Sequence, residues 1–282
     1  MLQFGLGTVL AMLISVIAWR LQLLSTSGMI AAGVVGALVF GMGGLAWAIL
    51  LVCFFFISSL LSRLARRRKA NLDDKYAKGS QRDAWQVIAN GGVAAIILVI
   101  TTLQRDVIGC NDTCFAANGW AFLIFAGSLA AANADTWATE LGVLSRTAPR
   151  LITTGHTVPF GTSGAISPVG SLASLAGSLF IAGLAALPWA GIPHPLGWQP
   201  IVILVVIAGV IGSFVDSILG ATLQTIYYCP SCNKETEKYP LHTCGTTTRQ
   251  IRGLSWLDND VVNFACTLSG AIIVSTVYLF IR

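Results

Sequence analysis

Eight long apolar segments are the feature that most constrains the fold of this chain. Several approach the ~20 residues that a helix needs to cross a bilayer, and a helix satisfies its own backbone hydrogen bonds in lipid. The pattern therefore predicts an all-α, polytopic transmembrane bundle of roughly seven or eight helices. The second segment is short and glycine-rich, so it is either a spanning helix or a half-inserted one. We place the segments near residues 3–19, 28–41, 44–62, 86–104, 119–142, 168–188, 200–221 and 260–280.

The composition excludes an ordinary soluble domain. Hydrophobic residues make up 55% of the chain and charged residues only 10%, against about 25% charged in soluble domains. The first apolar segment lacks the basic start and the small-residue cleavage site of a signal peptide, so we expect a retained helix. Without long linkers or low-complexity tails, residues 1–282 are expected to form a single integral membrane domain.

The basic residues predict which way the chain crosses the membrane. With eight crossings, only Arg105 and Arg282 of the 17 Lys and Arg residues fall on one side. The positive-inside rule makes the basic side cytoplasmic and puts both termini outside. The long cytoplasmic connections are then residues 63–85, 143–167 and 222–259. We expect the protein to lie in a bacterial inner (plasma) membrane, with Arg66 to Lys69 at anionic lipid headgroups. We expect no nucleic-acid partner, and the sequence does not indicate an oligomeric state.

Carboxylates inside the apolar segments are the strongest sign of chemistry. The stretch AANADTWATELG carries Asp135 and Glu140, and intramembrane carboxylates mark functional sites by default. Hard oxygen donors suit Mg²⁺, especially where substrate phosphates supply further ligands. We therefore predict Asp135, Glu140 and Asp216 as magnesium ligands, with Asp260 in a catalytic role beside Asp135 and Glu140. The alternative is a structural pair of carboxylates neutralised by Arg146 or Arg150.

Groups suited to an anion surround these acids in the sequence. Lys75, Lys78, Arg82, Gln86 and Asn90 form one stripe at helical spacing, which would bind a phosphate through charge-assisted hydrogen bonds or would simply be a solvated face. A loop rich in glycine and hydroxyl groups leads into the next helix, whose N-terminus favours negative charge; by itself such a loop is more often only a turn. The predicted phosphate-binding residues are Lys78, Arg82, Asn90, Asn133, Arg146, Arg150, Thr153, Thr154, Gly161, Thr162, Ser163, Gly164 and Asn263.

The cysteines fall into separate groups. Cys229, Cys232, His242 and Cys244 have the residue types of a Cys₃His zinc site, although the two halves are closer in sequence than in common zinc fingers. Reduced thiols without metal are the alternative. Cys110 and Cys114 fall outside the membrane, where a disulfide would form in an oxidising compartment.

Four motifs resemble a known family. They are RDAWQVIANG, ANADTWATELG, PRLITTGHTVPFGTSGAIS and LDNDVVN, and the resemblance covers nearly the whole chain. The family is the integral membrane family, long labelled of unknown function, that includes the plant phytyl-phosphate kinase of tocopherol synthesis and a human transmembrane homologue. The resemblance implies a helical fold distantly similar to CTP-using dolichol and phytol kinases. For the plant member it implies conversion of phytyl phosphate to the diphosphate with a nucleoside triphosphate.

These observations predict a phosphotransferase of the prenyl-phosphate kinase type. It would use Mg²⁺ and CTP or another nucleoside triphosphate, and its prenyl monophosphate would meet the nucleotide at the cytoplasmic membrane face. The alternative is a transporter or flippase of a lipid-linked or small anion, which would need important polar groups on both sides of the membrane. A weaker alternative is an assembly protein in which the polar cluster only holds helices together.

Overall fold

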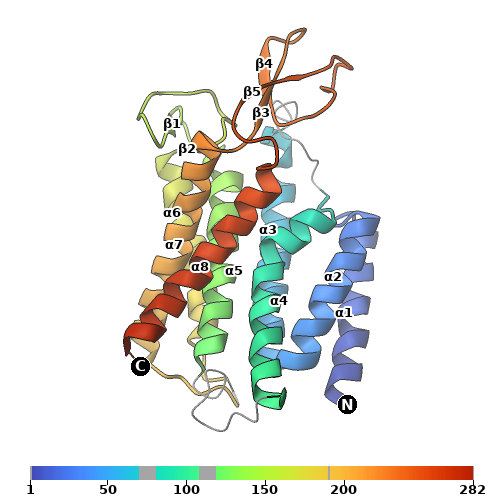
Figure 1. Cartoon of the computed structure of the whole chain (residues 1–282), viewed down its shortest axis with the longest axis vertical. Coiled ribbons are helices and arrows are strands. Elements are labelled where there is room, and N and C mark those ends of the chain that lie inside the picture. The colour runs from blue at the N-terminus through green and yellow to red at the C-terminus, as the bar shows by residue number, and fades with distance from the viewer. Residues whose placement is uncertain (1, 70–80, 108–118, 190, 282) are drawn as a thin grey trace.

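A computed structural model describes residues 2–69, 81–107, 119–189 and 191–281 (Figure 1). Most of this part of the chain is helical, with five short strands at one end. The helices are α1 (Leu2–Arg20), α2 (Thr26–Leu38), the π-helical turn η1 (Val39–Gly43), α3 (Leu45–Lys69), α4 (Ala84–Val107), α5 (Trp120–Gly142), α6 (Pro168–Ala185), α7 (Trp198–Thr222) and α8 (Asn259–Ile281).

Within the described residues, seven helices are long and apolar enough to cross a membrane, and the predicted helical membrane fold is confirmed. The second apolar segment is one of them. The π-helical turn continues α2, so that Thr26–Gly43 reaches 18 residues. By length and composition this segment is therefore a full span, which argues against the half-inserted alternative. The eighth helix, α5, is absent from that group, and its position in the bundle explains why.

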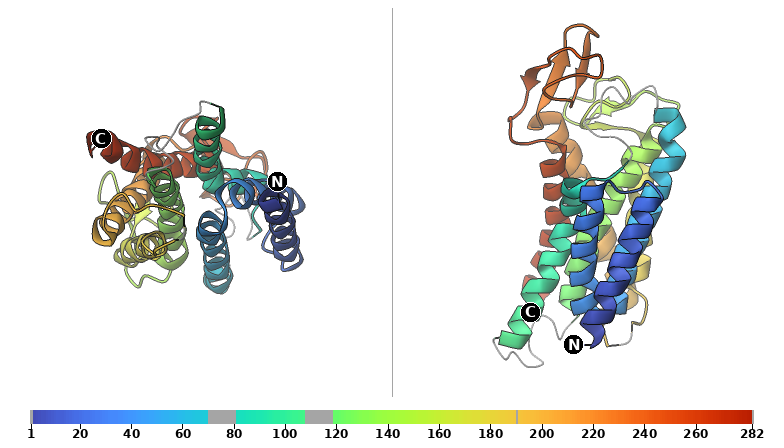
Figure 2. Two further views of the ribbon diagram at one scale, coloured as in Figure 1. Left: turned by 90° about the horizontal axis from the view of Figure 1, so that it is seen from below. Right: turned by 90° about the vertical axis from the view of Figure 1, so that its right-hand side faces the viewer.

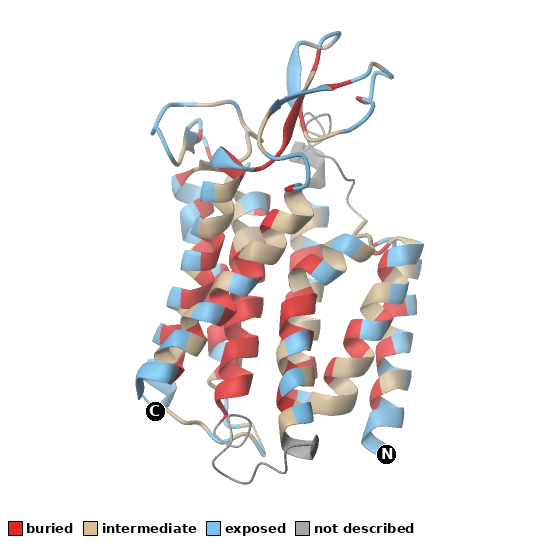
Figure 3. Ribbon diagram, in the orientation of Figure 1, coloured by how far each residue is buried: buried red, intermediate tan, exposed pale blue. Residues whose placement is uncertain are grey.

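Helix α5 is the central helix of the bundle. It packs against α3, α4, α6, α7 and α8, and every residue from Trp120 to Ala134 is buried, as Figure 3 shows in red. A helix enclosed by other helices does not face lipid, so its sequence can carry polar residues that a lipid-facing helix cannot. This enclosure is what allows α5 to bring Asn133, Asp135 and Glu140 into the bundle.

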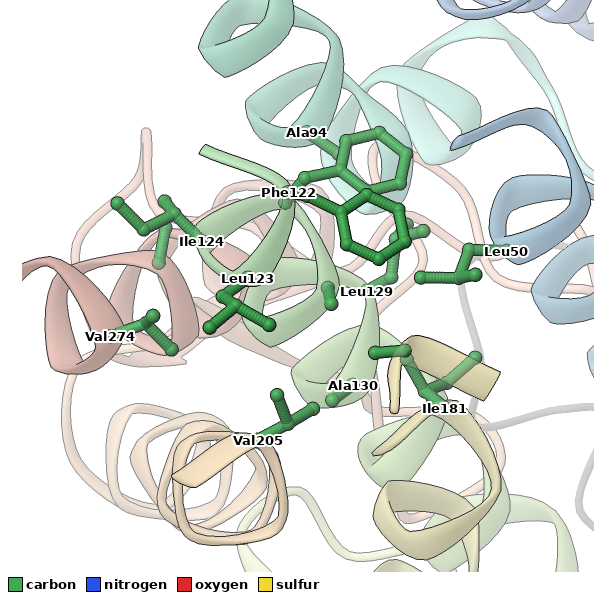
Figure 4. Close-up of a cluster of buried hydrophobic side chains, with 14 of the residues drawn as sticks. Leu50, Ala94, Phe122, Leu123, Ile124, Leu129, Ala130, Ile181, Val205 and Val274 are labelled. Carbon is green, nitrogen blue, oxygen red and sulfur yellow. The ribbon is translucent and has the colours of Figure 1, made fainter. Parts of the chain in front are cut away.

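The apolar core is built around the first half of α5. Figure 4 shows Phe122, Leu123 and Leu129 of this helix among side chains from its neighbours. Leu50 comes from α3 and Val205 from α7. The α5–α8 crossing is close because both helices present glycine there: a Cβ atom on Gly270 would lie 2.4 Å from the Gly127 carbonyl oxygen. Small residues permit such backbone approach between membrane helices.

The two ends of the bundle differ in structure. Both chain ends lie at the end opposite the strands (Figure 1 and the right view of Figure 2). The predicted connection 143–167 forms the pair β1 (Arg150–Leu151) and β2 (Ala165–Ile166). The predicted connection 222–259 forms a sheet of order β4-β3-β5, from Ile226–Cys229, Lys234–Thr236 and Arg249–Arg252. The predicted topology, in which eight crossings leave both termini on one side, agrees with both chain ends lying at the end opposite the strands.

The α5–α8 contact should be sensitive to a single methyl group. We expect Gly270→Ala to lower the free energy of unfolding by roughly 1–3 kcal/mol, as overpacking does in other cores. Thermal unfolding of the purified protein in detergent measures this. Gly183→Ala on α6 is the matched control, because a Cβ atom there would meet no heavy atom of the described residues within 4 Å. Equal stability of the two variants would contradict the packing described here.

Candidate metal and anion site at the strand-bearing end

A cavity of about 140 Å³ lies where α5, α6 and α7 meet the loop that joins α5 to α6. We call it the acidic cavity, because carboxylates from separate segments line it. Its other walls are hydroxyl groups, glycines and a few apolar side chains. The polar side chains and glycines among its lining residues are Asp135, Thr139, Gly142, Gly161, Thr162, Ser163, Gly164, Ser167, Gly170, Ser171, Ser174, Ser213, Asp216, Ser217, Gln224, Glu237 and Asn259.

Three carboxylates converge on the acidic cavity. Asp135 comes from α5, Asp216 from α7, and Glu237 follows β4 directly. The charges of both of the others act on Asp216. Its Oδ2 atom is buried and has no hydrogen-bond partner among the described residues. Like charges at membrane depth are costly unless a cation offsets them, and carboxylate oxygens are the ligands that Mg²⁺ prefers. These residues therefore fit a divalent cation.

Another part of the lining of the acidic cavity suits an anion. Helix α6 begins there, capped by Ser167, whose Oγ accepts a hydrogen bond from Gly170 N at 3.1 Å. The N-terminal end of a helix carries partial positive charge and attracts phosphates. The glycine loop beside it, residues 161–164, is pressed against α7: Gly164 has φ +78°, and a Cβ atom there would lie 2.3 Å from Ala221 N. Only glycine adopts this positive φ readily and also lacks a Cβ atom that would clash with α7.

A buried amide joins the glycine loop to the three-stranded sheet β4-β3-β5 and its turns, residues 226–252, which we call the strand unit. Gln224 is 2% exposed; its Oε1 accepts a hydrogen bond from Ser163 Oγ, and its Nε2 donates to Glu237 Oε1 at 2.9 Å. Arg252 of β5 donates from Nη1 to the Ala221 carbonyl at 3.0 Å. It thereby closes the C-terminal end of α7, where cations are favourable. The loop, α7 and the strands are thus held as one frame around the acidic cavity.

The structure brings together a part of the predicted site. The acidic cavity contains Asp135 and Asp216 of the predicted metal ligands, and Gly161, Thr162, Ser163 and Gly164 of the predicted phosphate loop. Thr162 also closes its own turn, since its Oγ1 donates to the Pro159 carbonyl at 2.7 Å. The hydroxyl groups of Thr162 and Ser163 are thus both used within the protein.

Glu140 requires a correction. It lies five residues after Asp135 on α5, which at 3.6 residues per turn turns it about 140° away. Glu140 is outside the acidic cavity: its Oε1 accepts a hydrogen bond from Ser62 of α3 at 2.9 Å, and its charge acts on Arg82. Burial lowers the pKa of Arg82 to about 10, and Glu140 opposes that shift. We reassign Glu140 from the metal to this charge pair.

The predicted amide ligands are used mainly within the bundle. Asn133 is fully buried, and it donates to the Gly177 carbonyl at 2.8 Å while accepting from Ser58 at 3.1 Å. It therefore ties α5 to α6 and α3. Asn90 donates to the Gln86 carbonyl of its own helix, and Asn263 to the Asn259 carbonyl. None of the three lines the acidic cavity.

Several other residues of the predicted site are either exposed or lie outside the described residues. Arg146, Arg150, Thr153 and Thr154 are exposed and lie outside the acidic cavity; Arg150 donates to the Gly155 carbonyl at 3.1 Å. No basic side chain of the described residues lines this cavity, so the binding of phosphate by these basic residues stays a prediction. Lys78, Lys75, Cys110 and Cys114 lie outside the described residues.

At the start of α8, the residue that lines the acidic cavity is not the predicted one. Asp258 caps the helix, since its Oδ1 accepts hydrogen bonds from Asp260 N and Val261 N at 3.0 and 3.1 Å. Asp260 does not line the acidic cavity, whereas Asn259 does. Asp260 therefore lies outside the candidate site, and its catalytic role stays a prediction.

Sequence analysis missed Glu237 as a site residue. It lies between the two halves of the Cys/His segment, more than one hundred residues after Asp135. No spacing rule connects such distant positions, and only the folding of the strands over α7 places Glu237 beside Asp216. Ser213 and Ser217 were missed as well, although both line the cavity and each lies at helical spacing from another residue of this wall, Ser213 three residues before Asp216 and four before Ser217.

A second cavity of about 70 Å³ lies among α1 to α4. Its walls are largely apolar, and Arg82, Gln86 and Asn90 line it as well. The predicted stripe is thus preserved in space for its described members. Arg82 is held by its backbone, which exchanges hydrogen bonds of 3.0 Å with Leu23 and Ser25 at the α1–α2 turn. Its guanidinium lies 5.5 Å from the Phe54 ring centroid.

The cysteine and histidine side chains of the strand unit gather at one point. The donor atoms of Cys229, Cys232, His242 and Cys244 all lie within 4.8 Å of one another. Hydrogen bonds with the Thr246 hydroxyl and with His242 hold the pKa of Cys244 down at about 5. The thiolate, which is the metal-binding form of cysteine, is therefore available at neutral pH.

Comparison with known proteins places this arrangement in a family. The model of the integral membrane protein DUF92 family matches residues 9–271. The chain belongs to this family. Protein PGR of Arabidopsis thaliana is 33% identical over 293 residues, covering 99% of this chain and 98% of that protein. The membrane protein MJ0933 of Methanocaldococcus jannaschii is 31% identical over 202 residues, covering 71% of this chain and 75% of that protein.

A plant relative with a chloroplastic name also aligns. Protein VTE6, chloroplastic, of Arabidopsis thaliana is 26% identical over 263 residues, covering 92% of this chain and 66% of that protein. No solved structure matches the chain. The resemblance to this membrane family that the four motifs indicate is thereby confirmed, and the protein is an integral membrane protein.

The acidic cavity should bind a divalent cation. Asp135 and Asp216 come from different helices and would both be metal ligands. We therefore expect Asp135→Asn and Asp216→Asn each to weaken Mn²⁺ binding by at least about 100-fold. Loss of a residue that only orients a metal ligand typically costs less, about 10–100-fold. Titration followed by the EPR signal of free Mn²⁺ measures this. Asp258→Asn is the control, since asparagine also caps helices. Unchanged Mn²⁺ affinity in both cavity variants would contradict a metal site here.

Proposed function

We propose that this DUF92 protein transfers a phosphoryl group from a nucleoside triphosphate, CTP among the candidates, to a prenyl monophosphate. The product would be the prenyl diphosphate. The observation that carries this proposal is the acidic cavity, which is lined by three carboxylates, by the N-terminal end of α6 and by the glycine loop. A site that offers cation ligands on one wall and anion-binding backbone on the other suits a metal-bound polyphosphate.

The residues of the acidic cavity would divide this work. Asp135 and Asp216 would hold Mg²⁺, with Glu237 in support, and the ion would offset phosphate charge as phosphoryl transfer requires. The backbone of residues 161–164 and the first turn of α6 would bind and orient the phosphates. Gln224 would keep the loop and Glu237 in register through its two hydrogen bonds. With no described basic side chain in the cavity, charge compensation would fall mainly to the metal and the helix end.

The second cavity supports a lipid as the acceptor. Its apolar walls lie at membrane depth among α1 to α4, and Arg82 forms its charged part. An amphiphile with an anionic head matches this combination of apolar walls and one cation. Glu140 lies on the same helix as Asp135 and acts electrostatically on Arg82. The lipid would therefore enter from the Arg82 side of α5, and its phosphate would have to reach the nucleotide phosphates in the acidic cavity for the phosphoryl group to be transferred.

The opposite end of the bundle favours an enzyme over a transporter. A cavity of about 430 Å³ lies there, lined by Gln3, Thr101, Thr102 and otherwise by glycine, proline and apolar residues. None of its described lining residues is ionisable, whereas an alternating-access carrier of an anion would use polar groups at both ends. We further propose that the strand-bearing end is cytoplasmic, in agreement with the positive-inside rule, and that in a bacterium the membrane is the inner membrane.

Turnover by the purified protein tests the proposal. With Mg²⁺, CTP and phytyl or geranylgeranyl phosphate, we expect the prenyl diphosphate to form, and Asp135→Asn and Asp216→Asn to lower kcat by at least about 100-fold. Arg82→Gln should raise KM for the lipid more than KM for the nucleotide. Mass spectrometry of the lipid product provides the measurement.

The control variant is again Asp258→Asn, which should retain full turnover. If folded protein forms no diphosphate from a panel of prenyl monophosphates with all four nucleoside triphosphates, the kinase proposal is wrong.

A further inference from the structure

We propose that Cys229, Cys232, His242 and Cys244 bind one zinc ion, and that this ion holds Glu237 over the acidic cavity. The zinc site stands independently of the proposed kinase activity. Its effect on the acidic cavity rests on the proposed cation site there. Nothing in the catalytic proposal uses these four side chains, and their arrangement needs a separate explanation.

The geometry of the four donors matches one tetrahedral metal ion. Tetrahedral zinc with Zn–S bonds of about 2.3 Å places its sulfur ligands about 3.8 Å apart. Here Cys229 Sγ lies 3.5 Å from Cys244 Sγ, and His242 Nδ1 lies 3.2 Å from the same sulfur. These separations are close to those of a shared ion, and the cysteines are free thiols rather than disulfide-bonded. Three sulfur ligands and one imidazole favour zinc over harder cations.

The strand unit is small and has few apolar side chains with which to hold itself together. Its sheet has strands of four, three and four residues, and its turns are largely exposed. Units of this size usually need a metal or disulfide in place of a core. The ligands come from the end of β3, the β3–β4 turn and the loop before β5. One ion would therefore join all three parts of the unit.

Glu237 lies between the two halves of this proposed zinc site. Cys229 and Lys234 pair across the β3–β4 hairpin, as do Tyr227 and Thr236, and Glu237 follows directly. On its other side the chain reaches His242 within five residues. An ion that fixes both flanks of this short segment also fixes where the Glu237 carboxylate points.

The hairpin also borders the glycine loop. A cavity of about 20 Å³ separates residues 161–163 from Glu235, Thr236 and Glu237. The Gln224 amide bridges the same two segments. Movement of the hairpin would therefore withdraw one carboxylate from the acidic cavity and disturb the loop at the same time.

Metal analysis of the full-length protein tests the zinc site. Purified in detergent without chelator, the protein should contain one equivalent of zinc by inductively coupled plasma mass spectrometry. Cys232→Ala and His242→Ala should lose it, whereas His242→Cys, which preserves four ligands, should retain it. Cys53→Ala on α3 is the matched cysteine control and should keep the zinc. A folded wild-type protein with substoichiometric zinc, or with iron in its place, would overturn the proposal.

Mn²⁺ titration tests the connection between the two metal sites. Removal of zinc from the wild-type protein with the chelator TPEN should weaken Mn²⁺ binding about 10–100-fold, the same loss as in Glu237→Gln. TPEN treatment of Glu237→Gln should cause little further loss, because the affected group is already gone. Size-exclusion chromatography verifies that the stripped protein remains folded.

Two results of that titration have separate meanings. Unchanged Mn²⁺ affinity in folded, zinc-free protein would overturn the positioning role of the zinc site. Failure of the zinc-loaded wild type to bind Mn²⁺ at all would instead overturn the cation site of the proposed function, and with it the proposed connection, while the zinc analysis would still decide the Cys₃His site.

Discussion

The repulsion among three carboxylates in one small cavity is the constraint on which the account of this protein depends. Asp135, Asp216 and Glu237 come from three different segments, and the fold brings them together at the edge of an apolar bundle. Such a cluster is stable only when a cation, protons or water offset the charge. A bound cation is the explanation that we propose, because the same cavity is lined by the glycine loop and by the first turn of α6, which suit the phosphates of a metal-bound nucleotide.

The burial of α5 makes this arrangement compatible with a membrane. The helix is surrounded by five others, and its first fifteen residues provide the core of the bundle. Asp135 and Glu140 then lie on the last two turns, where the apolar core ends and the strand-bearing end begins. Polar chemistry is thus placed at the boundary without exposing carboxylates to lipid. The close glycine crossings with α7 and α8 hold α5 in this position.

Sequence analysis predicted the features that depend on local pattern. The length of the apolar segments identified the helices, because lipid demands about 20 apolar residues per crossing, and Asp135 and Asp216 were visible as acids inside apolar runs. Cys229, Cys232, His242 and Cys244 were recognisable by residue type. The glycine loop was visible by composition, although its docking on Ala221 was not.

The missed features depend on rotation and on tertiary contact. Glu140 was grouped with Asp135 because the two are close in sequence, but helical rotation turns them to different neighbours. Asn133 resembled a ligand because it is polar and buried, yet its amide joins three helices. Glu237 could not be predicted, since its place depends on how the strand unit folds over α7. Arg146 and Arg150 were grouped with the site because they follow α5 in the sequence, but both are exposed and neither lines the acidic cavity.

The most direct measurement of the central claim is an experimental structure of the protein with Mn²⁺ and a non-hydrolysable CTP analogue. The account predicts an anomalous scattering peak about 2.1–2.3 Å from carboxylate oxygens of Asp135 and Asp216. It also predicts the nucleotide phosphates against the glycine loop and the first turn of α6. A well-ordered nucleotide bound elsewhere, with Asp135 and Asp216 distant from any metal, would contradict it.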